Sequence, residues 1–206
     1  MPRGRPREFD VDDALDAAMR LFWRRGFRAT TTRDLERALG VGQSSITSAF
    51  GAKADLAAAA LDRYLARLRA GLIDPLRDAD AGLSAIDAFL AGLSDWHCAD
   101  GGRGCLIGRL MCDGAHEEPP IAARVGEYRR ALRAALDAAL ARAVRAGELP
   151  AGGLEERREL LVAVILGMNL AVRAGYDVEA QRALARAGRA QVAAWRLDPR
   201  VAAGTA

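Results

Sequence analysis

Cysteine and long apolar runs are scarce in this chain of 206 residues. The three cysteines, Cys98, Cys105 and Cys112, are an odd number, which argues against the disulfide framework of a secreted protein. No stretch approaches the ~18–20 consecutive apolar residues that a membrane-spanning helix needs. Residues 1–10 are basic and contain no apolar core, so we expect no signal peptide and a cytoplasmic protein.

Two other kinds of pattern are missing. No segment alternates apolar and polar residues with β-branched enrichment, as a half-buried strand does. No phosphate-binding loop, nucleophile elbow or paired-carboxylate site is present, so we expect neither an enzyme nor a cofactor. A thiol-dependent catalyst that uses Cys105 with His97 or His116 remains the alternative in that class.

The chain shows helical periodicity. Apolar residues recur every three to four positions, and segments rich in Gly, Asp and Pro separate these runs. Asp10 is suited to cap the first helix, and Gly26 and Gly40 are suited to end the first two. The pattern predicts an all-α protein of about nine helices, at residues 10–25, 31–39, 43–50, 54–72, 84–99, 104–115, 119–146, 155–174 and 178–196.

Positive charge is concentrated near the N-terminus. Arg3, Arg5 and Arg7 form one basic patch, and six arginines between residues 20 and 37 form a second, whereas basic and acidic residues are nearly balanced from residue 61 onward. Since a local excess of arginine attracts polyanions, the distribution indicates a nucleic-acid partner for the N-terminal part.

The segments 31–39 and 43–50 have helix-turn-helix proportions, because a tight glycine-containing turn joins two short helices. Leu35, Ile46 and Phe50 are placed to hold the second helix against the first. The opposite face of the second helix carries Gln43, Ser44, Thr47 and Ser48, which are small or hydrogen-bonding side chains. Such a face lets a helix approach base edges in the major groove of DNA.

The run from Ala14 to Leu56, ALDAAMRLFWRRGFRATTTRDLERALGVGQSSITSAFGAKADL, resembles the DNA-binding domain of the TetR family of bacterial transcriptional regulators. It contains Leu-Phe-x-x-x-Gly-Phe at the end of the first helix, then Thr-Thr, Arg-Asp-Leu, Ala-x-Gly-Val and Phe-x-x-Lys-x-x-Leu in the order and spacing of that family. Two positions differ from the usual pattern. Gly42 stands where Ser or Thr caps the reading helix, and Thr47 stands where Tyr is usual, so individual DNA contacts cannot be copied from relatives.

The resemblance implies a ligand-responsive regulator, most often a repressor, that binds a pseudo-palindromic operator as a homodimer. It implies a DNA-binding domain at residues 1–53 and a helical effector-binding and dimerisation domain at residues 54–200. By matching positions, DNA contacts are expected from Gln43, Ser44, Thr47, Ser48, Thr31, Arg33 and Lys53, with an added basic arm of Arg3, Arg5 and Arg7. A DNA-binding module without an effector would need far less chain.

The C-terminal part offers candidate pocket residues, although aromatic and Met side chains at helical spacing more often fill a helical core. We name as candidate effector ligands Phe89, Trp96, Cys105, Met111, Tyr128, Met168 and Asn169. Residues 155–196 are the expected dimer interface, through apolar faces that carry Leu161, Val164, Ile165, Met168 and Val172 on one helix and Leu184, Ala187, Val192 and Trp195 on the other.

Cys105 suggests two further hypotheses. It follows a glycine-rich loop at the start of a predicted helix, where the helix dipole and Arg103 would lower its thiol pKa. The run Gly-Cys-Leu-Ile also resembles a stretch in TetR-type regulators that sense electrophiles, although a small buried residue is the simpler interpretation. A single helix over 104–116 would place Cys105, Cys112 and His116 on one face, a weaker hypothesis of a metal site.

Overall fold

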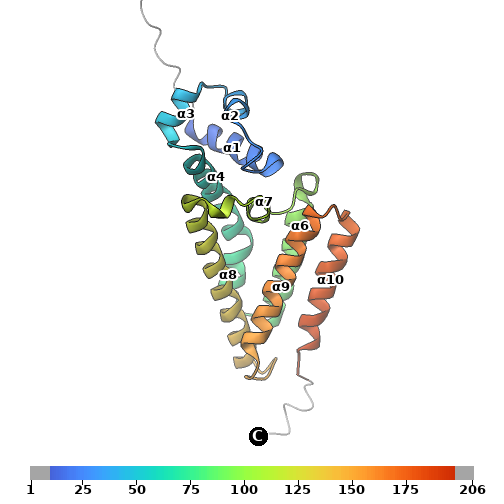
Figure 1. The fold of residues 1–206 in the computed structure, drawn as a ribbon. Helices are drawn as coiled ribbons and strands as arrows, with labels where there is room; N and C mark the ends of the chain where they lie inside the picture. The colour runs from blue at the N-terminus through green and yellow to red at the C-terminus, as the bar shows by residue number, and fades with distance from the viewer. Residues whose placement is uncertain (1–9, 198–206) are drawn as a thin grey trace, which may run out of the picture.

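The computed structural model describes residues 10–197. The described residues form helices and no strands, which confirms the predicted all-α class. Three helices, α1 (Val11–Arg25), α2 (Thr32–Leu39) and α3 (Gln43–Phe50), make a small head at one end of the molecule (Figure 1). The predicted boundaries of these helices agree with the structure to within two residues.

Local sequence explains the ends of the head helices. The Asp10 side chain accepts hydrogen bonds from the backbone N–H groups of Asp12 and Asp13 and so caps α1. Thr31 and Asp34 form a capping box at the start of α2, and Gly40 ends α2 in the left-handed conformation. Leu35 and Ile46 are buried beneath α2 and α3, so the two helices are held together from inside.

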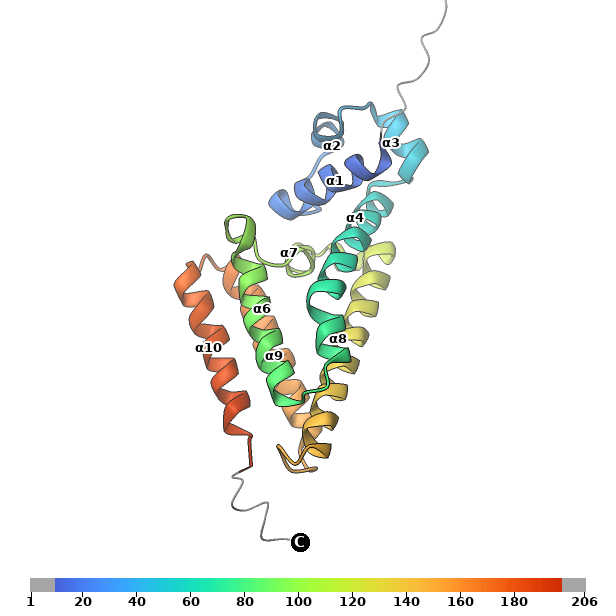
Figure 2. The same cartoon turned by 180° about the vertical axis from the view of Figure 1, so that it is seen from behind.

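The remaining helices form an elongated body. It consists of α4 (Lys53–Leu68), a π-helical turn (Arg69–Ile73), α5 (Asp74–Asp78), α6 (Leu83–Gly102), α7 (Leu106–Cys112), a 3-10 turn (Ala115–Glu117), α8 (Pro119–Arg145), α9 (Leu154–Arg173) and α10 (Val178–Ala194). Figure 2 shows α4 alongside α8 and α6 alongside α10, and the short α7 lies between the body and the head.

The single helix predicted at 54–72 differs from the structure only over residues 69–72. After Leu68 the helix widens into a π-helical turn, in which the Asp74 N–H bonds to the Arg69 carbonyl, and then continues as α5. Pro75 explains the break, because it has no N–H to continue the α-helical hydrogen-bond ladder. The described residues contain ten α-helices, close to the nine or so predicted, and the additional one arises because α5 is separated from α4.

Candidate functional site

The outer face of α3 is polar and has no internal partner. Gln43, Ser44, Thr47 and Ser48 are exposed, and within residues 10–197 none of their side chains forms a hydrogen bond. Ile46, by contrast, is buried against the head core. An eight-residue helix with one anchored and one unoccupied polar face is suited to bind an outside partner.

The N-terminus of α3 is capped in an unexpected way. Gly42 has no side chain to offer, but Glu36 of α2 reaches across the turn and accepts a hydrogen bond of 2.8 Å from the Gln43 backbone N–H. This contact replaces the Ser or Thr cap and ties the two helices of the helix-turn-helix together. This role of Glu36 was not predicted from the sequence, in which the only signal is an acidic residue seven positions before a helix without a capping side chain.

The start of α2 is held by hydrogen bonds and an ion pair, and it carries an exposed positive charge at Arg33. The Thr31 hydroxyl donates to Asp34 Oδ2 at 2.6 Å, and Asp34 also forms an ion pair with Arg25 at 2.5 Å. The hydrogen bond from Thr31 and the nearby Arg25 guanidinium lower the pKa of Asp34. Arg33 is exposed and has no ion-pair partner in the described part of the chain.

Lys53 holds the head to α4. Its Nζ donates to the carbonyls of Phe27 at 3.2 Å and Thr30 at 3.1 Å, and it lies 4.3 Å from the centre of the Phe27 ring. These contacts fix the ammonium group near the start of α2. Contact of Lys53 with a phosphate stays a prediction, and the predicted arm of Arg3, Arg5 and Arg7 lies outside the described residues.

Polar contacts join α7 to the back of the head. Asp113 Oδ2 accepts a hydrogen bond of 2.5 Å from the Phe27 N–H, and Arg109 donates to the Arg25 carbonyl at 2.6 Å. Gly26 permits this approach, because its φ is +83° and a Cβ there would lie 2.4 Å from Asp113 Oδ2. We call the contacts of Asp113 and Arg109 with the head the junction.

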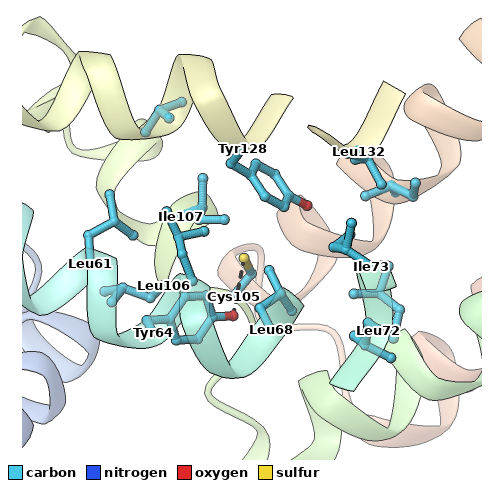
Figure 3. Close-up of a cluster of buried hydrophobic side chains, with 14 of the residues drawn as sticks. Leu61, Tyr64, Leu68, Leu72, Ile73, Cys105, Leu106, Ile107, Tyr128 and Leu132 are labelled. Carbon is cyan, nitrogen blue, oxygen red and sulfur yellow. Dashed lines mark hydrogen bonds between the residues drawn. The ribbon is translucent and has the colours of Figure 1, made fainter. Parts of the chain in front are cut away.

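Cys105 is buried among hydrophobic side chains that include Tyr64 (Figure 3), and Tyr64 forms an aromatic cluster with Trp23 and Trp96. The Trp96 indole N–H donates to the Tyr64 hydroxyl at 2.9 Å, and that hydroxyl lies 3.4 Å from the Cys105 sulfur. Trp23 of α1 packs edge-on against Tyr64. Although Cys105 does precede α7, burial raises the pKa of its thiol, so the expected lowering is wrong.

The metal hypothesis lacks the helix that it needs. α7 ends at Cys112, and Gly114 turns the chain in the left-handed conformation before His116. Cys105, Cys112 and His116 therefore do not share one helical face. Within the described residues, no cluster of three His, Cys, Asp or Glu side chains is arranged to hold a metal ion.

A cavity of about 490 Å³ opens between α7, α8 and α9. Three of the predicted effector ligands, Met111, Tyr128 and Asn169, line it. The other four do not, because Phe89, Cys105 and Met168 are buried in the core and Trp96 belongs to the aromatic cluster. Tyr128, Leu132 and Ile107 line the cavity and also belong to the buried cluster that contains Cys105, which Figure 3 shows.

The apolar face chosen on α9 for dimerisation is wrong. Leu161, Ile165 and Met168 are buried within the chain, as is Val192 of α10. The opposite face of α9 is exposed, and Leu170 is 58% accessible. The exposed large apolar side chains of this region are Leu160, Leu166, Leu170, Tyr176, Val178 and Leu184, of which only Leu184 belongs to the predicted set.

Two family models match this chain. Residues 14–60 match the family model of the bacterial regulatory proteins of the tetR family, and residues 82–188 match the tetracyclin repressor-like C-terminal domain. The chain belongs to the TetR family. It is thus a DNA-binding transcriptional regulator of the ligand-responsive type, as the sequence resemblance predicted. No helix within residues 10–197 is long and apolar enough to cross a membrane.

Relatives within the TetR family support the assignment. The chain is 30% identical to the transcriptional repressor ComR of Escherichia coli (strain K12) over 182 residues, which cover 86% of both chains. Its structure is similar to that of a cysteine mutant of the TetR regulator CifR bound to 26-bp operator DNA, with a TM-score of 0.76, 25% identity and coverage of 91% of this chain and 98% of that one. Reduced E. coli NemR has the same fold, with a TM-score of 0.77, 21% identity and coverage of 91% and 97%.

Proposed function

We propose that this TetR-family protein is a repressor that binds a pseudo-palindromic operator as a homodimer and is released from it by a small-molecule effector. The observation that carries the proposal is the exposed polar face of α3, whose side chains form no hydrogen bond within residues 10–197 and which is held by Glu36 and Ile46. The similar CifR structure contains operator DNA, which supports the same use of this head.

The proposed DNA contacts fall into two groups. Gln43 and Ser44, with Thr47 and Ser48, face base edges and nearby phosphates, because they occupy the exposed side of α3. Thr31, Arg33 and Lys53 lie where α2 and α4 begin and would contact the sugar-phosphate backbone. Arg3, Arg5 and Arg7 would add backbone or minor-groove contacts from the N-terminal arm.

Dimerisation would use the exposed face of α9 together with α10, within residues 155–196. Leu166 and Leu170 of this face also line the cavity between α7, α8 and α9, so a second copy would lie against its α9 side. Six large apolar side chains are exposed there in the single chain. Gly167, which also lies on the exposed side of α9, leaves open space for a neighbouring helix. Because exposed apolar surface of this extent is costly in water, we expect a second copy of the chain to bury it.

The cavity between α7, α8 and α9 is the proposed effector site. Its wall includes Met111 and Cys112 of α7, and the junction joins the end of the same helix to the head. A ligand that shifts α7 would therefore change the orientation of the two heads, and operator affinity would fall by the ligand's differential affinity for the two states.

Three broader assignments complete the proposal. We assign the chain no catalytic role, because the Tyr64 hydroxyl and the Cys105 thiol are buried in the core. A regulator of bacterial DNA works in the cytoplasm, where that DNA lies.

The division into residues 1–53 and 54–200 assigns α4 to the body, although α4 also packs against α1 and so connects both parts.

A mobility-shift assay on the DNA directly upstream of the gene tests the proposal. The protein should retard that duplex in the presence of excess unrelated DNA, and the affinity should fall as salt is raised because released counterions oppose binding. Equal affinity for the upstream duplex and a scrambled duplex of the same length would contradict it.

A further inference from the structure

The cavity of the proposed effector site has an apolar interior. Apolar side chains from all three surrounding helices line it, namely Ile107, Met111, Leu132, Val162, Ile165 and Leu166. Its volume of about 490 Å³ lies within the range of roughly 300–1,000 Å³ that small-molecule sites occupy. The cavity therefore suits a ligand with a compact apolar body.

Charged groups at the mouth of the cavity do not cancel. Arg129 and Arg133 lie one turn apart on α8, and Glu159 lies opposite on α9. Glu159 is already occupied, because it accepts hydrogen bonds from Arg133, at 2.9 Å to Oε2, and from Arg158, at 3.0 Å. Arg129 is exposed and has no ion-pair or hydrogen-bond partner within residues 10–197. One unpaired positive charge thus lines the cavity.

We propose that this cavity binds a small amphipathic anion, an apolar body that carries one carboxylate, and that Arg129 pairs with the carboxylate. The inference rests on the proposed function in naming the ligand class of the effector site. An arginine guanidinium binds a carboxylate through two parallel hydrogen bonds, which gives it both affinity and orientation. The acyl or aromatic body then lies along Met111 and Ile165 in the cavity.

Asn169 also lines the cavity. Its side-chain oxygen is buried and lies toward His97 in the core, so this oxygen is not accessible from the cavity. Asn169 therefore shapes the cavity wall, and the polar recognition of a ligand depends on Arg129.

Calorimetric titration with three probes of one chain length tests the proposal. Octanoate, octan-1-ol and octylammonium have the same apolar body and differ in charge. Octanoate should bind at least fivefold more tightly than octanol, and octylammonium should bind most weakly. Arg129→Gln should remove the preference for octanoate and leave octanol binding unchanged. Arg130→Gln is the matched control, because Arg130 is the next residue of α8 and lines a different hollow, against Arg69 and Glu127.

Several results would overturn the inference. Equal affinity for octanoate and octanol would show that the carboxylate does not contribute to binding. Equal effects of the Arg129 and Arg130 substitutions would show that Arg129 does not pair with the carboxylate. Octanoate binding that survives Val162→Phe, which narrows the cavity, would place the ligand elsewhere. If octanoate fails to bind the dimer or dissociates it in light scattering, a second copy fills the cavity instead.

Two separate assays measure DNA binding and ligand binding. The mobility-shift assay with and without octanoate reports release from the upstream duplex, while calorimetry reports binding to the protein alone. A protein that retards the duplex but shows no preference for octanoate refutes the inference and leaves the proposed function standing. A protein that prefers octanoate but ignores DNA refutes the proposed function.

Discussion

Asp113 is the residue through which the junction is most directly tested. Its carboxylate accepts hydrogen bonds from the Phe27 N–H at 2.5 Å and from the Ala115 N–H at 3.1 Å, and Phe27 is buried. Asp113→Ala would leave both N–H groups without their acceptor. A hydrogen bond to a charged group contributes about 1.5–3 kcal/mol, and the second, longer bond adds less, so we expect a loss of about 2–3 kcal/mol.

The assay is thermal and urea unfolding of the full chain at fixed protein concentration, because dimerisation makes the midpoint depend on concentration. For a chain of this length, a loss of 2–3 kcal/mol lowers Tm by roughly 4–12 °C. Asp113→Asn keeps an acceptor oxygen without the charge and should lose about half as much.

Asp95→Ala is the matched control, because Asp95 is exposed on α6 and has no hydrogen bond or ion pair in the described part of the chain. Its effect should stay within about 0.5 kcal/mol. If Asp113→Ala destabilises the protein no more than Asp95→Ala does, the junction does not hold the head to α7.

Four more predictions follow from other parts of the molecule. Iodoacetamide should alkylate exposed Cys112 well before buried Cys105, and mass spectrometry of peptides that shows the reverse order would contradict the burial of the aromatic cluster. Gln43→Ala should change base preference in a panel of operator variants, and an unchanged ranking would remove Gln43 from base contact. Leu170→Glu should shift the protein toward monomer in light scattering, whereas an intact dimer would place the interface elsewhere. Burial lowers the pKa of His97 from 6.5 to about 4, so the unfolded chain binds the proton first and stability should fall by about 2–3 kcal/mol from pH 7 to pH 4, a slope that His97→Gln should reduce.

The sequence predicts the local features of the head because they depend on neighbouring residues. Asp10 and the Thr31–Asp34 box begin helices, and Gly26 and Gly40 end them, each through hydrogen bonds or dihedral angles set within a few positions. These short-range signals placed α1 to α3 to within two residues. They also identified the polar face of α3, since Ile46 and Phe50 are the large apolar residues of that helix and both pack against the core.

Features that depend on tertiary packing could not be predicted from the sequence. α9 is apolar on two faces, and nothing local distinguishes buried Leu161 from exposed Leu160 or Leu170, so the wrong face was predicted for dimerisation. Cys105 does lie at the start of a helix, but burial next to Tyr64 outweighs the helix dipole and raises its pKa. The path of Glu36 across the turn to Gln43 likewise appears only once the two helices are placed.

Selection of duplexes from a random pool tests whether the protein binds an operator as a dimer. The full-length protein should enrich one inverted repeat, with half-sites separated by about one helical turn or a multiple of it, and native mass spectrometry should find an even number of protomers on each selected duplex. Enrichment of no sequence, or of a single asymmetric site bound by one protomer, would contradict operator binding as a dimer.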